Sequence, residues 1–309
     1  MLIIGENIHV IAPRVKEAIE ARDARFIQEL AVAQAEAGAG IVDLNIGPQK
    51  KAGHEVMPWI VEAVQQVVDV PLSLDTTNLA AMEEGLKVCA RPAMLNSASA
   101  DPERLDSVMA LAAKYGARVI ALTMGVDGIP PTADGRAGMA MEALLPAAEA
   151  HGIPPQDVFL DPLVLTVTCN QDITRETIEA IRMFKMMSDP PPTTTVGLSN
   201  ISNGCPPDMR PLINRVMLVL LMGAGLDSAI ADPLDGEQNE VIRIVEERDE
   251  DAPLGALYLA LHDASAAMEV LDPSLVDEDD PAQVEVFKTY RILQNEVIYA
   301  DSFLEASRK

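Results

Sequence analysis

The chain has 309 residues, of which 49% are hydrophobic, so it can bury a large core. Aromatic residues make up only 3%, and that core must therefore be built from Ala, Val, Leu, Ile and Met. The formal net charge of −25 at pH 7 repels nucleic acid and anionic membrane surfaces, so we expect neither as a partner.

Short, mostly apolar segments rich in β-branched residues recur along most of the chain. Such segments are typical of parallel strands, which are buried on both faces. In chain order, the predicted strands lie near residues 2–4, 41–44, 71–74, 93–95, 118–122, 158–160, 194–198 and 227–230.

Longer, Ala-rich segments with helical periodicity separate these strands. Gly38 and Gly116 follow two of them, where glycine supplies a left-handed cap. The predicted helices cover residues 24–37, 56–68, 79–88, 102–115, 137–151, 174–187 and 211–222. This alternation predicts a (β/α)8 TIM barrel. A doubly wound open sheet is the alternative, but the chain has no phosphate-binding Gly-rich loop to favour it.

The pattern loosens after the eighth predicted strand. Three helices are predicted at 237–248, 254–270 and 283–304, and acidic linkers separate them. The run 277–280 is purely acidic, and it predicts an exposed loop because like charges repel one another. We therefore expect a barrel core at 1–235 and C-terminal helices at 236–309 that complete it, with an acidic insertion within 233–291.

Three features bear on where the protein works. Cys89, Cys169 and Cys205 have neither zinc nor iron–sulfur spacing, and they suggest reduced thiols. Glu6 comes too early for a secretory signal peptide, and no apolar run approaches the roughly 20 residues that span a bilayer. These features predict a cytoplasmic protein.

Carboxylate and carboxamide side chains stand at the ends of most predicted strands. One such residue is usually a helix N-cap. In a barrel, however, all strand ends meet at one mouth, which is where active sites lie. The set comprises Glu6, Asn7, Asp43, Asn45, Asp75, Asn78, Asn96, Asp161, Asn200 and Asp232.

The strand-end set is poor in Lys, Arg, His and Cys. It contains no Schiff-base lysine and no Ser-His-Asp or Cys-His combination. The four histidines lie apart in the sequence, so we expect no metal bound by this chain. Carboxylates and carboxamides can instead pair with the donors and acceptors along the edge of a planar heterocycle, such as an aminopyrimidinone.

Several of these strand ends form motifs of a known group. The motifs are Ile4-Gly5-Glu6-Asn7, Asp43-Leu44-Asn45-Ile46-Gly47-Pro48, Leu74-Asp75-Thr76-Thr77-Asn78 and Asn96-Ser97. They resemble the pterin-binding barrels, which include dihydropteroate synthase and the folate module of cobalamin-dependent methionine synthase. Within that group, Gly197-Leu198-Ser199-Asn200-Ile201-Ser202 and 210–215 are most similar to the methyltetrahydrofolate:corrinoid protein methyltransferases, as are 229–232 and 299–303.

This resemblance implies an α/β barrel, usually dimeric, that moves the N5 methyl of methyltetrahydrofolate to cobalt(I) of a corrinoid protein, or the reverse. By the resemblance, Asp75, Asn96 and Asp161 hold the pterin edge and Asn200 faces N5. Supporting or folate-binding roles fall to Ser199, Asn203 and Arg210, and the expected substrate-binding set also includes Glu6, Asp43 and Asn45.

The sequence departs from the family in two places near the mouth. Close relatives often carry an Arg and an Asn-Gly where this chain has Glu6-Asn7-Ile8-His9. The loop 203–209 is longer than in those relatives, which bears on Asn203 and Arg210.

The implied chemistry is an SN2 displacement at a methyl group bonded to nitrogen. Asn200 is predicted to donate a hydrogen bond to N5 that strengthens in the transition state, through a network with Asp161 and Ser199. The corrinoid is expected on a partner protein, because the chain has no Asp-x-His-x-x-Gly motif. Two alternatives remain: a dihydropteroate synthase-like enzyme, for which 227–232 lacks basic residues, and a non-catalytic pterin-binding protein.

Overall fold

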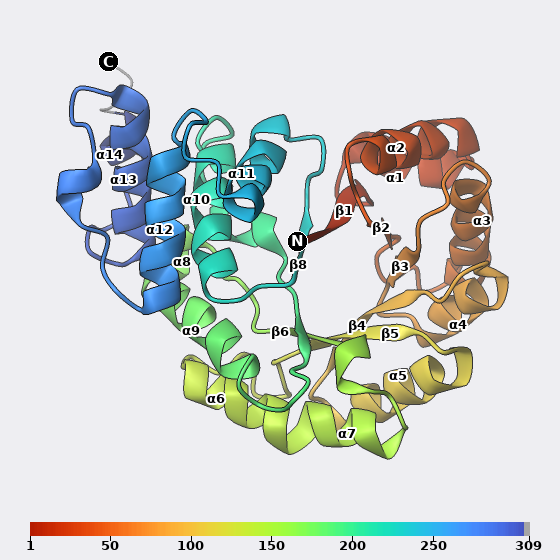
Figure 1. Ribbon diagram of the computed structural model, residues 1–309. Coiled ribbons are helices and arrows are strands. Elements are labelled where there is room, and N and C mark those ends of the chain that lie inside the picture. The colour runs from red at the N-terminus through yellow and green to blue at the C-terminus, as the bar shows by residue number, and fades with distance from the viewer. Residues whose placement is uncertain (306–309) are drawn as a thin grey trace.

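Eight parallel strands form one sheet in the order β7-β6-β5-β4-β3-β2-β1-β8 in the computed structural model, which describes residues 1–305 (Figure 1). Gly197 pairs with Ile230 in an isolated parallel bridge, which joins the two ends of the sheet and closes the barrel. The strands are β1 (Leu2–His9), β2 (Ile41–Asn45), β3 (Leu72–Asp75), β4 (Met94–Ser99), β5 (Arg118–Leu122), β6 (Val158–Asp161), β7 (Thr193–Thr194) and β8 (Ser228–Ala231). The prediction of a closed barrel is confirmed.

Helices surround the strands (Figure 1). Two of them, α1 and α2, connect β1 to β2, and the α6–α7 connection contains a π-helical stretch at Ala140–Leu144. The outer helices are α1 (Pro13–Ala21), α2 (Ala24–Glu36), α3 (Gly53–Gln65), α4 (Leu79–Val88), α5 (Pro102–Tyr115), α6 (Ala133–Met139), α7 (Leu145–Ala150), α8 (Val167–Asn170), α9 (Thr174–Phe184), α10 (Arg210–Gly223) and α11 (Gly236–Glu247).

The strands bury apolar side chains on both faces, which explains their apolar sequences. Inside the barrel, Ile4, Ile41, Met94, Ile120 and Phe159 pack into one cluster. A second and larger cluster fills the space between the strands and the helices. Since side chains alternate along a strand, Asp43 follows Ile41 on the inner side of β2 and lies toward the mouth.

Capping residues set the ends of several helices. Asn78 accepts a hydrogen bond from the backbone N–H of Ala81 at 3.2 Å and caps α4. Asp235 caps α11 in the same way. Gly38 and Gly116 have positive φ angles of 101° and 62°, so the predicted left-handed caps are confirmed. At Asn78 the strand-end residue is therefore a structural cap.

Several predicted elements differ from the structure. β1 continues to His9, and α1 was not predicted. β7 ends at Thr194, because a 3-10 turn (Leu198–Ser202) begins within the predicted strand 194–198. The predicted helix 283–304 is divided near Asn295, whose φ of 58° ends a helix.

Three further helices form a layer outside the barrel: α12 (Gly255–Ala267), α13 (Pro281–Leu293) and α14 (Asp301–Glu305) (Figure 1). α12 packs closely on α10, since a Cβ at Gly223 would lie 2.4 Å from the carbonyl oxygen of His262. Because α11 directly follows β8, it belongs to the ring of helices around the strands. The division at residue 235 stays a prediction, and 306–309 of its second part lie outside the described residues.

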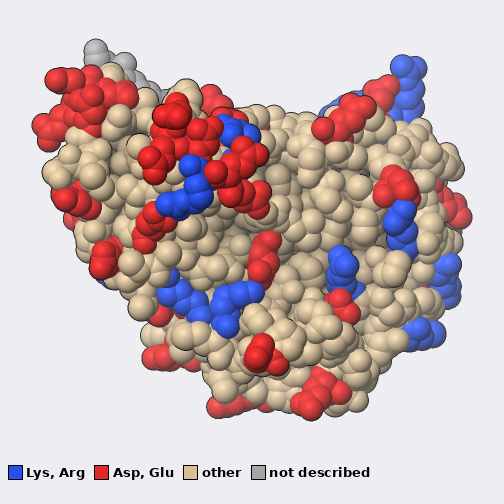
Figure 2. Space-filling view, in the orientation of Figure 1, with Lys and Arg blue, Asp and Glu red and all other residues tan. Residues whose placement is uncertain are grey.

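Acidic side chains gather over the C-terminal helices, in the upper left part of Figure 2. Asp277, Glu278 and Asp279 are exposed, as predicted, and Asp280 caps α13 through the backbone N–H of Ala282 at 2.9 Å. Within residues 1–305, none of the helices has both the length and the apolar character that crossing a membrane requires.

Candidate active site

A cavity of about 670 Å³ opens at the end of the barrel where the strands finish. All of the predicted site residues line it, since parallel strands carry their last side chains to the same rim. These residues are Glu6, Asp43, Asn45, Asp75, Asn96, Asp161, Ser199, Asn200, Asn203 and Arg210. Of the strand-end set, Asn78 does not line the cavity, because it caps α4.

β2, β3 and β4 contribute a row of alternating carboxylates and amides. Their register places Asn45 beside Asp75 and Asp75 beside Asn96. The amide nitrogen of Asn45 donates to Asp75, and its amide oxygen accepts from the N–H of Gly47 at 3.0 Å. Asn96 donates to Oδ1 of Asp43 at 3.2 Å. Strand pairing therefore fixes the donors and acceptors of this row.

Burial makes the two carboxyl groups of this row weaker acids. Desolvation raises the pKa of Asp75 to about 6, against the opposing hydrogen bond from Asn45 and the charge of Arg104. Desolvation also raises the pKa of Asp43, and the neighbouring Asp75 adds to the increase. Because both groups are short of favourable partners when ionised, a ligand that donates N–H groups would stabilise the ionised forms.

Asp161 lies at the end of β6 and is buried. Its Oδ1 accepts from the backbone N–H of Leu163 at 2.7 Å. Leu163 has a φ of 68°, a left-handed conformation that costs free energy for a leucine and that accompanies this tight turn. Desolvation raises the pKa of Asp161 to about 7, although Leu163 and the buried Arg136 oppose the shift.

Two side-chain pairs link β1 to the segments that follow β7 and β8. The hydroxyl of Ser199 donates to the carboxyl group of Glu6, and Nδ2 of Asn7 donates to Oδ1 of Asp232 at 2.8 Å. Desolvation raises the pKa of Glu6 to about 7, and the charges of Asp232 and Asp43 contribute, whereas Ser199 lowers it. At neutral pH the raised pKa values of Glu6 and Asp161 correspond to partly protonated carboxyl groups in the cavity.

Asn200 and Asn203 lie in the segment between β7 and α10. Nδ2 of Asn203 donates to Oδ1 of Asn200 at 3.2 Å, and Arg210 donates to Oδ1 of Asn203 at 3.4 Å. The predicted network joined Asn200 to Asp161 and Ser199. In the structure Ser199 instead donates to Glu6, and the hydrogen-bond partner of the Asn200 side chain is Asn203.

The predicted set omitted several residues that shape the cavity. Asn7 and Asp232 belong to the strand-end set and Asn214 belongs to the motif 210–215, but the sequence assigns none of them a role. Oδ1 of Asn7 and Oδ1 of Asn214 are buried without a hydrogen-bond partner among residues 1–305, and both residues line the cavity. Unpaired buried polar atoms beside a cavity suggest a polar ligand.

Arg104 also supports the site, although it does not line it. Its guanidinium donates to the backbone oxygens of Ser97, Thr76 and Thr77 and so fixes the loops after β3 and β4. An arginine in the first turn of a predicted surface helix gave no sequence signal for this role. In the part of the chain that the structure describes, His, Cys, Asp and Glu do not form a group of three or more suited to a metal ion.

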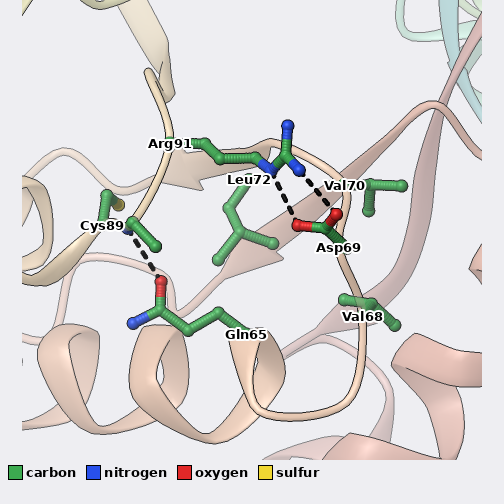
Figure 3. A pocket seen from close by; sticks show the side chains of 8 residues that line it. Gln65, Val68, Asp69, Val70, Leu72, Cys89 and Arg91 are labelled. Atoms are coloured by element: carbon green, nitrogen blue, oxygen red, sulfur yellow. Dashed lines mark hydrogen bonds and ion pairs between the residues drawn. The ribbon is translucent and has the colours of Figure 1, made fainter.

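A second hollow lies between the end of α3 and the start of β3 (Figure 3). Its volume is about 40 Å³, and the ion pair between Arg91 and Asp69 closes one side at 2.5 Å. At about 10–15 Å³ for each water, it has room for only a few solvent molecules. This hollow is therefore too small for a heterocyclic ligand, whereas the cavity at the strand ends has room for one.

Comparison with known proteins connects this geometry to a family. The family described as "Pterin binding enzyme" matches residues 14–232. The methylcorrinoid:tetrahydrofolate methyltransferase of Eubacterium limosum is 33% identical over 238 residues, which cover 75% of this chain and 85% of that protein. The methionine synthase of Mycobacterium tuberculosis (strain ATCC 25618 / H37Rv) is 32% identical over 240 residues, 74% of this chain but only 20% of that longer protein.

Solved structures of dihydropteroate synthases share the fold. The enzyme from Thermus thermophilus superposes with a TM-score of 0.56 and 22% identity, covering 80% of this chain and 93% of that one. The Yersinia pestis enzyme gives a TM-score of 0.55 and 21% identity over the same shares of the two chains. At these identities the likeness concerns the barrel and not its substrates.

Proposed function

Because the chain belongs to the family of pterin-binding enzymes, we propose that its barrel mouth binds a reduced folate and that it transfers the N5 methyl group between methyltetrahydrofolate and a corrinoid. The chain is thus a methyltransferase. The observation that carries the assignment is the fixed row of carboxylates and amides on β2, β3 and β4, in a chain 33% identical to a methylcorrinoid:tetrahydrofolate methyltransferase.

The pterin ring presents its aminopyrimidinone edge to this row. Asp75 and Asp161 accept from the ring N–H groups, and Asn96 pairs with a ring acceptor. Asp75 and Asn96 lie side by side on β3 and β4, and Asp161 lines the same cavity from the end of β6. A buried carboxylate with a raised pKa gains from each ring N–H, so the site discriminates against ligands that lack these donors.

Methyl transfer requires N5 to leave with the electron pair of the broken C–N bond. The methyl carbon forms its new bond to cobalt, and N5 takes up a proton to give tetrahydrofolate. Asn200 donates a hydrogen bond to N5, which strengthens as charge develops there. Glu6 and Asp161, whose pKa values are each raised to about 7, can retain a proton in the cavity at neutral pH.

The corrinoid belongs to a partner protein that docks over the barrel mouth. The name of the Eubacterium limosum relative includes both a corrinoid and a folate, and the cavity opens at a rim that a second protein could cover. The proposal includes a homodimer, which the resemblance implies, and a cytoplasmic location, which the cysteines and the N-terminal sequence predict.

Calorimetric titration with methyltetrahydrofolate, followed by addition of free cob(I)alamin, tests the proposal. We expect saturable binding and then the visible spectrum of methylcobalamin. Binding without transfer to free or protein-bound corrinoid would favour a non-catalytic pterin-binding protein. Absence of binding would contradict the assignment of the strand-end residues.

A further inference from the structure

Three polar side chains form a series beside the cavity, and all lie within eleven residues of sequence. Nη2 of Arg210 contacts Oδ1 of Asn203 at 3.4 Å, and Nδ2 of Asn203 contacts Oδ1 of Asn200 at 3.2 Å. Two further hydrogen bonds hold the guanidinium in place. Nε donates to Oγ of Ser202 at 3.1 Å, and Nη2 donates to the backbone oxygen of Ser199 at 3.4 Å.

The guanidinium of Arg210 fixes the orientation of the Asn203 and Asn200 amides. An arginine side chain can only donate, so the atom of Asn203 that faces it must be the amide oxygen. The amide nitrogen of Asn203 then points toward Asn200. Since this nitrogen also can only donate, Asn200 must turn its oxygen toward it.

The backbone of Asn203 is held independently of its side chain. The hydroxyls of Thr166 and Thr168 both donate to its carbonyl oxygen, the latter at 3.3 Å. The Asn203 side chain therefore leaves from a fixed point between Arg210 and Asn200.

The amide nitrogen of Asn200 lies on the opposite side, over Gly197. A Cβ built at Gly197 would lie 3.0 Å from this nitrogen, closer than most Cβ contacts. Gly197 and Asn200 both line the cavity. The missing side chain at residue 197 thus leaves room for the Asn200 amino group at the cavity wall.

We propose that Arg210 and Asn203 are positioning residues that set the polarity of the Asn200 amide, so that Asn200 presents N–H hydrogens, and not its oxygen, to the folate N5. This inference rests on the proposed function and adds a role for residues outside direct contact with the reacting atoms. Arg210 orients the Asn203 amide, and the Asn203 amide in turn orients that of Asn200. If the Asn200 amide were reversed, its oxygen would face the N5 lone pair and the stabilising hydrogen bond would be lost.

The variant Asn203→Asp separates this role from simple support. Aspartate keeps the shape and the acceptor for Arg210 but cannot donate to Asn200, so the Asn200 amide turns its nitrogen toward the new carboxylate. Loss of one transition-state donor lowers rates by about 100-fold or more, so we expect Asn203→Asp to slow transfer by about 100-fold. Asn203→Ala leaves Asn200 free to take either orientation, and we expect a loss of about 10-fold or less.

The experiment measures single-turnover methyl transfer to free cob(I)alamin at saturating methyltetrahydrofolate. Gln156→Glu is the matched charge control, since Gln156 is exposed and precedes β6 at the other end of the barrel. The order of rates should be Gln156→Glu, Asn203→Ala and Asn203→Asp, from fastest to slowest. If the unaltered protein transfers methyl normally but the two Asn203 variants have equal rates, the inference is overturned and the proposed function is not.

A second readout does not depend on turnover. The affinity for methyltetrahydrofolate is compared with that for its 5-deaza analogue, which has carbon in place of N5. The unaltered protein and Gln156→Glu should prefer the nitrogen ligand by a margin below about 5-fold, because the hydrogen bond to N5 is weaker in the bound ground state than in the transition state. Asn203→Asp should lose this preference. An unchanged preference in Asn203→Asp would contradict the inference. If the unaltered protein neither binds nor methylates, the proposed function fails, and the inference fails with it.

Arg210→Gln provides a further test should Asn203→Asp fail to fold. A glutamine amide can donate or accept, so it no longer fixes the polarity of Asn203. We expect a transfer rate below that of Gln156→Glu and a weaker preference for the nitrogen ligand. A variant with the unaltered rate and preference would overturn the inference.

Discussion

Ser199 and Glu6 are 193 residues apart in the chain, yet the Ser199 hydroxyl donates a hydrogen bond to the Glu6 carboxyl group. This contact joins the end of β1 to the turn after β7, next to the bridge between Gly197 and Ile230 that closes the barrel. Closure therefore buries Glu6 among other acidic groups, and its pKa rises to about 7 from an ordinary value of 4.5.

The raised pKa of Glu6 predicts a pH-dependent cost to stability. Between pH 4.5 and 7 the folded protein retains a proton that the unfolded chain has released. The stabilising contribution is therefore complete below pH 4.5 and is lost as the pH rises to 7. Glu6→Gln, which keeps an acceptor for Ser199, should raise the free energy of unfolding at pH 8 by about 1–3 kcal/mol.

Thermal unfolding of the folate-free protein at pH 8 and pH 5 measures this effect. The advantage of Glu6→Gln should shrink toward zero at pH 5, where both side chains are neutral. Glu278→Gln is the control, because Glu278 is exposed in the acidic loop. An advantage of equal size at both pH values would show that charge burial is not its cause.

Asp75→Asn should weaken folate binding. The carboxylate accepts hydrogen bonds from charged or polar N–H groups more strongly than an amide does, and an amide also presents a donor to the ring. A lost charge-assisted hydrogen bond of about 1.5–3 kcal/mol corresponds to roughly 10- to 100-fold in affinity. Since the pKa of Asp75 is about 6, the affinity of the unaltered protein should increase as the pH rises through that value.

Calorimetric titration with methyltetrahydrofolate from pH 5 to pH 8 checks both statements. Asp69→Asn is a matched control, because Asp69 pairs with Arg91 beside the small hollow of Figure 3 and not at the barrel mouth. If Asp75→Asn binds as tightly as Asp69→Asn, Asp75 does not hold the pterin ring.

The strands could be predicted because burial on both faces leaves an apolar segment, and β5 matches its predicted bounds of 118–122. The bounds of β7 could not be predicted, because the closing edge of the barrel depends on one bridge at Gly197 and the chain then bends into a 3-10 turn. The residue pattern around Gly197 carries no information about its partner Ile230 on β8.

The site could be predicted as a set of positions but not as a set of contacts. Barrel topology alone brings the strand ends together, so Asp75 and Asp161 could be selected from sequence. The pairing of Asn7 with Asp232 spans 225 residues and requires the pairing of β1 with β8. The hydrogen bonds of Arg104 to the backbone oxygens of Thr77 and Ser97 could not be predicted either, because they depend on how the segments around these residues fold over α5.

Asn200→Ala should reduce methyl transfer much more than folate affinity. A hydrogen bond that strengthens only as N5 gains charge contributes to the transition state and little to the bound ground state. We expect transfer to fall by about 100-fold or more and the dissociation constant to change by less than about 5-fold. Single-turnover rates and calorimetry on the same preparation provide the comparison, and similar losses in both would assign Asn200 to binding only.

Gly197→Ala tests the space that the Asn200 amide requires. The added Cβ would meet Nδ2 of Asn200 at 3.0 Å, so the amide must shift by a few tenths of an ångström. The strand and turn tolerate alanine, because Gly197 has a φ of −81°. We therefore expect a nearly unchanged unfolding temperature, together with a transfer rate about 10-fold lower from misplacement of the donor.

Gly138→Ala is the control for that substitution, since a Cβ at this helical position meets nothing within 4 Å. Replacing a glycine inside a helix should raise stability by roughly 0.5–1 kcal/mol and leave methyl transfer unchanged. The two alanine variants therefore affect different properties: Gly138→Ala changes the unfolding temperature, and Gly197→Ala changes the rate. A Gly197→Ala variant with the full transfer rate would show that the Asn200 amide does not need the position it occupies over Gly197.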